Sequence, residues 1–280
     1  MSRPSDRALI WDQIRYQNTI FWRTPVAAFF TLAFPLMFLI VFTLIFGNEE
    51  IPELGVTTAQ FYAPALAVFG AVSATYTNLA IGTAISRDLG ILKRVRGTPL
   101  PPWMYLAGRI GSAAYLAAIS AAIMLGFGIA FFGVRIYPEA VPSLLISFAV
   151  GVACWSALGM LAAALSPSGE SAPAVTNATL LPLAFISDIF IPPGSNTPGW
   201  VTTVGEIFPL KPFATAFQDA FNPQVIAATE GWLDHVHWPE LGVMATWGIG
   251  AVLLAIRLFR WEPKGGERVG RKTPVAVDET

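Results

Sequence analysis

Residues 26–46 read VAAFFTLAFPLMFLIVFTLIF, a run without a single charged side chain. An α-helix needs about 20 apolar residues to cross the hydrocarbon core of a bilayer. Because lipid offers no hydrogen-bond partner to an open backbone, such a run crosses the membrane as a helix. It starts too late, and is too long, for the apolar region of a signal peptide, and no cleavage pattern follows it. We therefore expect it to be a permanent membrane span.

Five more apolar segments follow, at residues 59–85, 104–132, 142–165, 174–186 and 241–259. The segment 174–186 is the weakest of them, because Pro182 and Asp188 interrupt its far end. The chain is 54% hydrophobic and only 12% charged, whereas soluble domains carry about 25% charged residues. A transmembrane β-barrel would instead show alternating strands of about ten residues. The sequence therefore predicts an all-α membrane protein with six transmembrane helices.

The basic residues predict the orientation of this bundle, because Lys and Arg collect in cytoplasmic loops. On one side of a six-span arrangement lie Arg3, Arg7, Arg15, Arg23, Arg87, Lys93, Arg94, Arg96, Arg109, Arg257, Arg260, Lys264, Arg268, Arg271 and Lys272. Only Arg135 and Lys211 fall on the other side. We expect both termini in the cytoplasm and the chain in a bacterial inner membrane. Arg109, near the start of the third span, is expected to snorkel to the cytoplasmic headgroups.

Two segments outside the spans carry apolar patches. Residues 4–23 form an amphipathic pattern typical of a helix lying in the membrane interface, although packing on the protein's own bundle would also explain it. Residues 187–240 hold apolar patches too short to span, so we expect short re-entrant helices or a small outer cap before the last span. Asp188, at the start of this stretch, is expected at the outer interface, because a carboxylate in hydrocarbon is costly.

A third segment, residues 87–100, reads RDLGILKRVRGTPL between the second and third spans. On a helical wheel its apolar side chains share one arc and its basic ones occupy the rest; the apolar set is Leu89, Ile91, Leu92 and Val95. An amphipathic helix of this kind suits docking into the groove of a partner protein. Ordinary cytoplasmic charge beside lipid headgroups explains it equally well.

Polar side chains interrupt two of the spans. Thr75 and Asn78 lie in the second span, and Thr176 and Asn177 lie in the fifth. Polar groups at membrane depth often face a pathway. The alternative is hydrogen bonding between helices, worth about 0.6 kcal/mol each. We keep these four residues as candidates for lining a transport pathway.

The chain carries no catalytic motif of its own. The segment nearest to a phosphate-binding loop, residues 270–273, lacks the earlier glycine that the motif requires. His235 and His237 share one polar loop without a cysteine partner, so we expect no metal site. The protein is therefore not expected to be an enzyme or to hold a cofactor, and any ATP and Mg²⁺ would be bound by a separate ATPase. Membrane lipid is an expected partner and nucleic acid is not.

The segment 87–100 resembles the cytoplasmic signature of the ABC-2 type permeases, the membrane subunits of a class of ATP-binding-cassette exporters. An acidic residue, a glycine, a leucine, a basic turn and Thr-Pro-Leu recur there at this spacing, followed here by Trp103, Leu106, Gly108 and Arg109. Residues 62–64, 190–192 and 208–210 add weaker similarity, so the resemblance spans the chain. Gly97 departs from the pattern, and we expect the helix to end there, because glycine lowers helix propensity.

The resemblance implies one domain, 1–280, with an interfacial helix (1–25), a six-helix membrane domain (26–259) and a basic tail (260–280). Such permeases work as dimers, of one chain or of two siblings, with two ATPase subunits. The ATPase-coupling residues that it implies are Asp88, Leu89, Gly90, Leu92, Lys93, Arg94, Val95 and Arg96. It also implies export, as in antibiotic resistance by efflux. The apolar spans and their few charges favour a drug-like or lipid-like cargo over an ion, and a polysaccharide remains an alternative.

Two other functions remain to be compared with this one. A secondary transporter, working without an ATPase, usually shows inverted repeats and buried coupling carboxylates. An intramembrane enzyme needs paired catalytic groups at depth. Neither histidine lies in a span, and Asp188 has no second carboxylate beside it in the fifth span.

Overall fold

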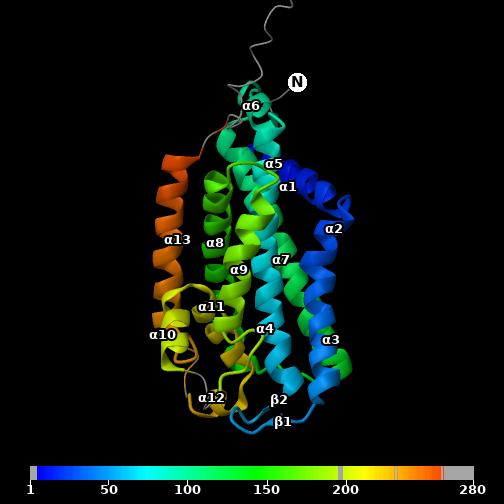
Figure 1. Ribbon diagram of the computed structural model, residues 1–280, viewed down its shortest axis with the longest axis vertical. Helices are drawn as coiled ribbons and strands as arrows, with labels where there is room; N and C mark the ends of the chain where they lie inside the picture. Colours follow the sequence, from blue (N-terminus) through cyan, green and yellow to red (C-terminus); the bar gives the residue numbers. More distant parts are fainter. Residues whose placement is uncertain (1–4, 195–197, 230, 232, 260, 262–280) are drawn as a thin grey trace, which may run out of the picture.

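The computed structural model describes residues 5–194, 198–229, 231, 233–259 and 261. They form a mostly helical bundle whose long helices run along one axis (Figure 1). Five helical segments are long and apolar enough to cross a membrane, namely Pro25–Phe46, Thr58–Asp88, Pro102–Phe132, Pro138–Leu165 and Trp238–Leu258. This arrangement is that of a multi-pass membrane protein.

The sixth predicted segment forms the shorter helix α9, Ala172–Ile186, with 15 residues. At 1.5 Å per residue it is about 22 Å long, which is less than the roughly 30 Å of a hydrocarbon core. It runs beside α5 and α8 in the bundle (Figure 1). Its far end is where Pro182 and Asp188 weaken the apolar pattern of the sequence.

Two of the long segments are interrupted by π-helical turns. The first comprises α2 (Pro25–Ala28), the π-helix η1 (Phe29–Ala33) and α3 (Phe34–Phe46). The second comprises α4 (Thr58–Val72), the π-helix η2 (Ser73–Asn78) and α5 (Leu79–Asp88). Ser120, on α7 (Pro102–Phe132), donates to the carbonyl oxygen of Thr31 in η1 over 3.2 Å. Such turns widen a helix locally and are frequent at functional sites.

The two ends of the bundle differ. Helices α1 (Asp6–Trp22) and α6 (Ile91–Arg96) lie at one end, here called the α6 end, together with the last turn of α13 (Trp238–Leu258) (Figure 1). The opposite hairpin end carries α12 (Pro223–Ala227) and the antiparallel strands β1 (Glu50–Ile51) and β2 (Val56–Thr57). The predicted basic tail, 260–280, lies outside the described residues except for Trp261.

The core of the bundle surrounds α4, whose residues are all buried. It packs against α3, α7 and the short helix α11 (Leu210–Gln218). The helix α8 (Val141–Leu165), which begins after the 3₁₀ turn η3 (Pro138–Ala140), packs against α13 and against η2. Helix α8 also packs against α11, where a glycine permits the close approach, because a Cβ on Gly151 of α8 would collide with the ring of Phe213 on α11.

Residues 187–240, expected to hold short helices, do so. They contain α10 (Gly199–Ile207), α11, the 3₁₀ turn η4 (Asp219–Phe221) and α12. The turn between α10 and α11 lies beside the middle of α13, where Trp247 Nε1 donates to the carbonyl oxygen of Ile207 over 2.7 Å. The chain therefore folds back from the hairpin end into the bundle before α13 begins.

Candidate functional site

A cavity of about 420 Å³ lies between α2–η1–α3, α4–η2–α5 and α9. We call it the seam cavity. Phe30, Phe34 and Phe69 supply aromatic surface to it, and Leu180 and Leu181 add aliphatic surface from α9. Both π-helical turns contribute lining residues, so the local widening of two helices shapes the same space.

The polar lining of the seam cavity consists of hydroxyl and amide groups, from Thr24, Thr31, Ser73, Thr77, Asn78 and Asn177. None of its described lining residues carries a charge. The buried Oγ1 atom of Thr77 has no hydrogen-bond partner within the described chain. A largely apolar cavity with a few polar groups is typical of a small-molecule site, and this one suits an amphipathic molecule without an essential charge.

The four predicted pathway residues divide into two pairs. Asn78 and Asn177 line the seam cavity from two different helices. Thr75 and Thr176 are fully buried, and their hydroxyls donate to the carbonyls of Ala71 and Ala172, each four residues earlier in the same helix. The threonine hydroxyls are thus hydrogen-bonded within their own helices, whereas the asparagines face the cavity.

The segment 87–100 forms two helices and not one. Helix α5 continues to Asp88, and Gly90 then adopts a left-handed conformation with φ of 68° before α6 begins. Only glycine takes up this conformation without a steric penalty. The expected end of the helix at Gly97 is confirmed.

The apolar residues expected on one arc of this segment do not share one environment, because some are buried in the protein and others lie on its surface. Leu92 is fully buried against the bundle, whereas Leu89 is 62% exposed. Lys93, Arg94 and Arg96 are also exposed. The segment itself therefore offers a partner Leu89 and three cations, whereas Leu92 holds α6 on its own bundle.

Arg87 and Asp88 make the most extensive polar contacts at the α6 end. The Arg87 side chain is only 2% exposed, and it donates to the carbonyl oxygens of Ala163 (2.9 Å) and Ser166 (3.0 Å) at the end of α8. Asp88 Oδ2 accepts from the backbone N–H of Gly169 over 2.6 Å. In the sequence Arg87 stands out only as a cytoplasmic charge, because no local pattern marks its distant partners.

The sequence suggested that Arg109 snorkels to the headgroups, and this prediction is wrong. The residue is only 8% exposed. Its Nη1 atom donates to Ser86 Oγ (2.8 Å) and Tyr105 Oη (2.9 Å), and its guanidinium approaches Gly82. A neighbouring helix with a glycine and a serine gives the cation a site inside the protein. The contact fastens α5 to α7.

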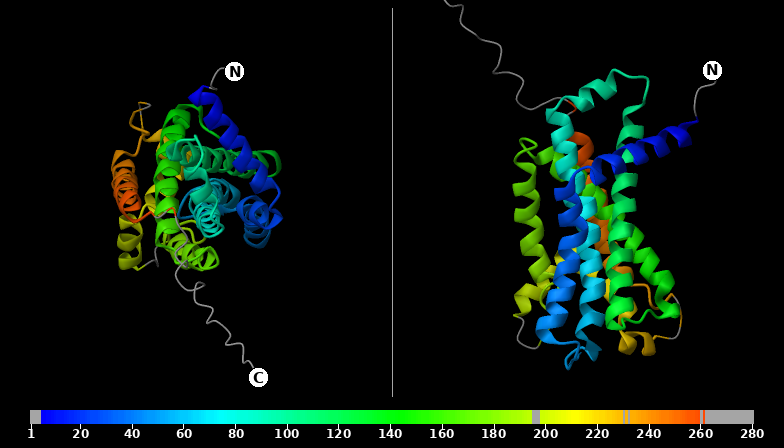
Figure 2. Two further views of the ribbon diagram at one scale, coloured as in Figure 1. Left: turned by 90° about the horizontal axis from the view of Figure 1, so that it is seen from above. Right: turned by 90° about the vertical axis from the view of Figure 1, so that its right-hand side faces the viewer.

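Helix α1 lies across the bundle at the α6 end (Figure 2). It packs on α7, where a Cβ on Gly108 would collide with Gln13, and Ser112 Oγ donates to Asn18 Oδ1 over 2.6 Å. Its other side exposes Trp11, Tyr16, Ile20 and Trp22. Helix α1 therefore packs on the bundle through one side and exposes an aromatic face on the other.

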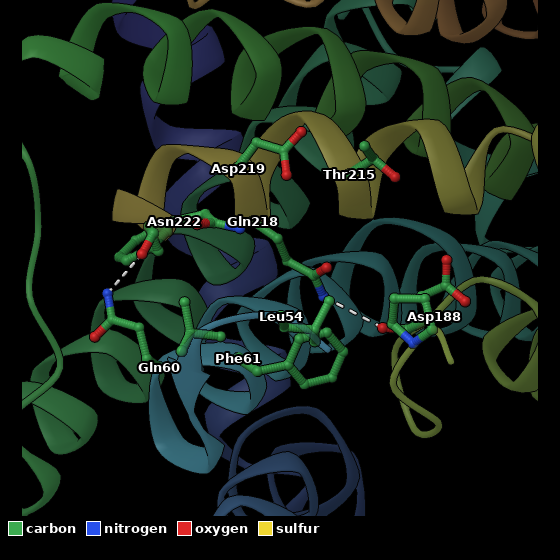
Figure 3. Close-up of a pocket in the computed structure, with 11 residues that line it drawn as sticks. Leu54, Gln60, Phe61, Asp188, Thr215, Gln218, Asp219 and Asn222 are labelled. Carbon is green, nitrogen blue, oxygen red and sulfur yellow. Dashed lines mark hydrogen bonds between the residues drawn. The ribbon is translucent and has the colours of Figure 1, made fainter. Parts of the chain in front are cut away.

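A smaller pocket of about 220 Å³ lies at the hairpin end (Figure 3). Gln218 reaches across it, and its Nε2 atom donates to the carbonyl oxygen of Asp188 over 3.4 Å. The pocket's two carboxylates already have basic partners, Lys211 Nζ at 3.1 Å from Asp188 and His237 Nε2 at 3.3 Å from Asp219. Burial raises the pKa of both Asp188 and Asp219. Among the described residues, no group of His, Cys, Asp and Glu side chains could hold a metal ion.

Removing Lys211 is expected to destabilise the protein. The Lys211 and Asp188 side chains are 12% and 19% exposed, so Lys211→Met should cost about 2–3 kcal/mol, somewhat less than breaking a fully buried pair. Lys211 lowers the Asp188 pKa, so its loss raises that pKa further above the unfolded value. The loss in the free energy of unfolding is then present at neutral pH, and it shrinks as the pH falls through the folded-state pKa of Asp188.

Thermal unfolding in detergent between pH 4 and pH 8 checks this expectation. The double variant Asp188→Asn/Lys211→Met, which removes both charges, should recover most of the loss. A deficit in Lys211→Met that does not change with pH would contradict the electrostatic account.

Comparison with known proteins agrees with this architecture. The model of the family described as ABC-2 type transporter matches residues 8–222. The chain is also similar to the daunorubicin resistance ABC transporter permease protein DrrB1 of Streptomyces coeruleorubidus. The two are 28% identical over 244 residues, which cover 84% of this chain and 80% of the relative. Because the family model covers most of the chain and the helices form a multi-pass bundle, this protein belongs to the ABC-2 type transporter family.

Proposed function

We propose that this chain is the membrane-spanning permease subunit of an exporter that moves an amphipathic, drug-like or lipid-like molecule out of a bacterial cell. Membership in the family supports the transport role, and a similar protein is named for daunorubicin resistance. The observation that carries the choice of cargo is the seam cavity, which is largely apolar and lined by hydroxyls and amides without a charge. Asn78 and Asn177 line the pathway by hydrogen-bonding the polar groups of the cargo.

In this proposal α9 is a sixth transmembrane helix and the α10–α11 pair is re-entrant from the outer side. The hydrogen bond between Trp247 and Ile207 supports a turn at mid-bundle depth. The α6 end faces the cytoplasm, because α6 carries three exposed basic residues and cations favour that side. Both termini are then cytoplasmic and the membrane is the inner one, while the exposed aromatic face of α1 lies among the lipid headgroups.

Energy comes from a separate ATPase, because this chain has no phosphate-binding loop. We place two ATPase subunits and a second permease copy, identical or a sibling, in the complex. The ATPase docks on the exposed face of the segment 89–96, where Leu89 offers an apolar contact and Lys93, Arg94 and Arg96 attract an acidic groove. Electrostatic complementarity of this kind sets specificity and association rate.

The double variant Leu89→Asp/Arg96→Glu tests this docking face. Both side chains are exposed, so the bundle should fold normally while the ATPase no longer co-purifies from mild detergent. We expect the bound ATPase to fall at least about tenfold, which corresponds to roughly 1.4 kcal/mol of lost binding. Leu92 is left unchanged, because its burial would confound docking with folding.

The matched control is Arg135→Glu/Leu233→Asp, which makes the same chemical changes on exposed residues away from the α6 end. It should retain the ATPase. If the wild-type chain recruits no ATPase under any condition, the proposal fails and a secondary transporter becomes the better hypothesis. If the docking variant retains as much ATPase as its control, the partner binds elsewhere.

A further inference from the structure

We propose that Arg87, Asp88 and the turn 166–171 between α8 and α9 form a clasp that transmits the movement of α6 to α9 during transport. The inference rests on the proposed ATP-driven function and extends it to positioning residues whose contacts are with the end of α8 and the turn that follows it. Such residues act through the wall of the cavity and touch neither cargo nor nucleotide.

Arg87 supplies one half of the clasp. The last carbonyls of a helix have no partner within it and carry a partial negative charge. The Arg87 guanidinium meets these groups at the end of α8, with Nη1 at 2.9 Å from the Ala163 oxygen and Nη2 at 3.0 Å from the Ser166 oxygen. A third contact, to the Pro167 oxygen, measures 3.4 Å. The fork of a guanidinium holds several acceptors in fixed directions, which a lysine cannot do.

Asp88 supplies the other half. Its Oδ2 atom accepts from Gly169 N over 2.6 Å, and its Oδ1 atom lies 3.2 Å from Arg87 Nε. A hydrogen bond to a carboxylate is roughly twice as strong as one between neutral groups. Gly169 sits directly on α5, because a Cβ there would lie 2.9 Å from the Cα atom of Ile85. Two side chains and one backbone contact therefore hold the turn against the last turn of α5.

The turn itself is internally braced, so it moves as one piece. Ser168 N donates to Ser171 Oγ over 3.0 Å, and Ser171 N donates back to Ser168 Oγ over 3.2 Å. Helix α9 begins at the next residue, Ala172. One turn later α9 presents Asn177 to the seam cavity.

The position of the clasp decides what it connects. One residue, Leu89, separates Asp88 from Gly90, the left-handed glycine at which α6 begins. On the other side, α5 and α9 are two walls of the seam cavity. A displacement of α6 is therefore transmitted to the ends of α5 and α9 nearest to it. The clasp makes α9 move together with α5. Coupling between two sites requires such a contiguous element with alternative arrangements.

Thiol accessibility of α9 tests this inference without knowledge of the cargo. Asn177→Cys places a thiol on α9 where it lines the seam cavity, and Cys154 is only 2% exposed. The permease with its co-purified ATPase is labelled with a water-soluble maleimide, with and without Mg-ATP and vanadate. We expect nucleotide to change the labelling rate in the otherwise unaltered chain. Asp88→Asn and Arg87→Lys should each reduce that change at least about fivefold, the lower range of allosteric coupling, with the amount of bound ATPase unchanged.

Glu170→Gln is the matched control, because it makes the same kind of change to an exposed carboxylate in the same turn. It should behave like the unaltered chain. Equal nucleotide response in the clasp variants and the control would overturn the inference, as would a purely structural loss in which response and ATPase binding fall together. Failure of the unaltered chain to bind any ATPase would instead overturn the proposed function, and the clasp with it.

Discussion

Gly159→Val is expected to prevent this protein from folding into a stable bundle. Gly159 lies on α8 where the π-helical turn η2 approaches, and a Cβ there would collide with the carbonyl oxygen of Thr75 and lie 3.0 Å from that of Tyr76. Both obstacles are backbone atoms, so no side chain can rotate away. Overpacking typically costs about 1–3 kcal/mol, and displacement of a packed helix should raise the loss above about 4 kcal/mol, a large effect for a single substitution.

Size-exclusion chromatography and thermal unfolding in detergent measure this loss. Gly126→Val is the matched control, because Gly126 lies within a long helix and a Cβ there would meet no atom within 4 Å. We expect the control to remain monodisperse with little change in unfolding temperature. Equal behaviour of the two variants would show that the close approach of α8 to η2 is dispensable.

Asn177→Arg should abolish export while leaving the protein folded and bound to its ATPase. Asn177 is exposed and lines the seam cavity, where no described lining residue could neutralise the new charge. A charge within the membrane costs about 2.5–3.5 kcal/mol on insertion scales, and the long side chain also occupies space that cargo would fill. We expect transport to fall at least about tenfold, or roughly 1.4 kcal/mol, because the cargo would have to bind beside an unpaired cation.

Uptake of an uncharged amphipathic dye into inside-out vesicles, with ATPase recovery measured in parallel, checks this expectation. The control is Ala174→Arg, one turn earlier on α9, at an exposed position outside the cavity lining. Asn177→Leu should retain more activity than Asn177→Arg, because it keeps the cavity neutral. Full transport by Asn177→Arg would exclude the seam cavity as the route.

Much of this fold is predictable from the sequence, because lipid imposes its requirements residue by residue. An uncharged run such as 26–46 has to be a helix, and the structure places a long apolar helical segment there. The same argument does not predict that the 15-residue α9 spans the membrane, because its length alone does not reach across the hydrocarbon core. Its place is decided by packing against α5 and α8.

The candidate sites were only partly predictable, for a different reason. Polarity singled out Thr75 and Asn78 together, yet only the packing of neighbouring helices decides that Asn78 faces the seam cavity. Periodicity likewise assigned Leu89 and Leu92 to one arc, whereas Gly90 breaks the helix between them. Arg87 and Arg109 look like ordinary cytoplasmic charges until their partners from other helices are known.

The two π-helical turns give the seam cavity an unusual sensitivity to the length of the chain. A π turn holds more residues than an α turn, so deleting one residue from η1 or η2 could restore regular α-helix there. The segments on either side would keep their orientation, because a π turn holds its extra residue within one turn, and only the local widening would be lost. A single codon lost at either place would therefore remodel the cavity wall at the lining residues of that turn and leave the rest of the bundle in register. Related chains could thus acquire new cargo preferences through insertions and deletions as well as through substitutions.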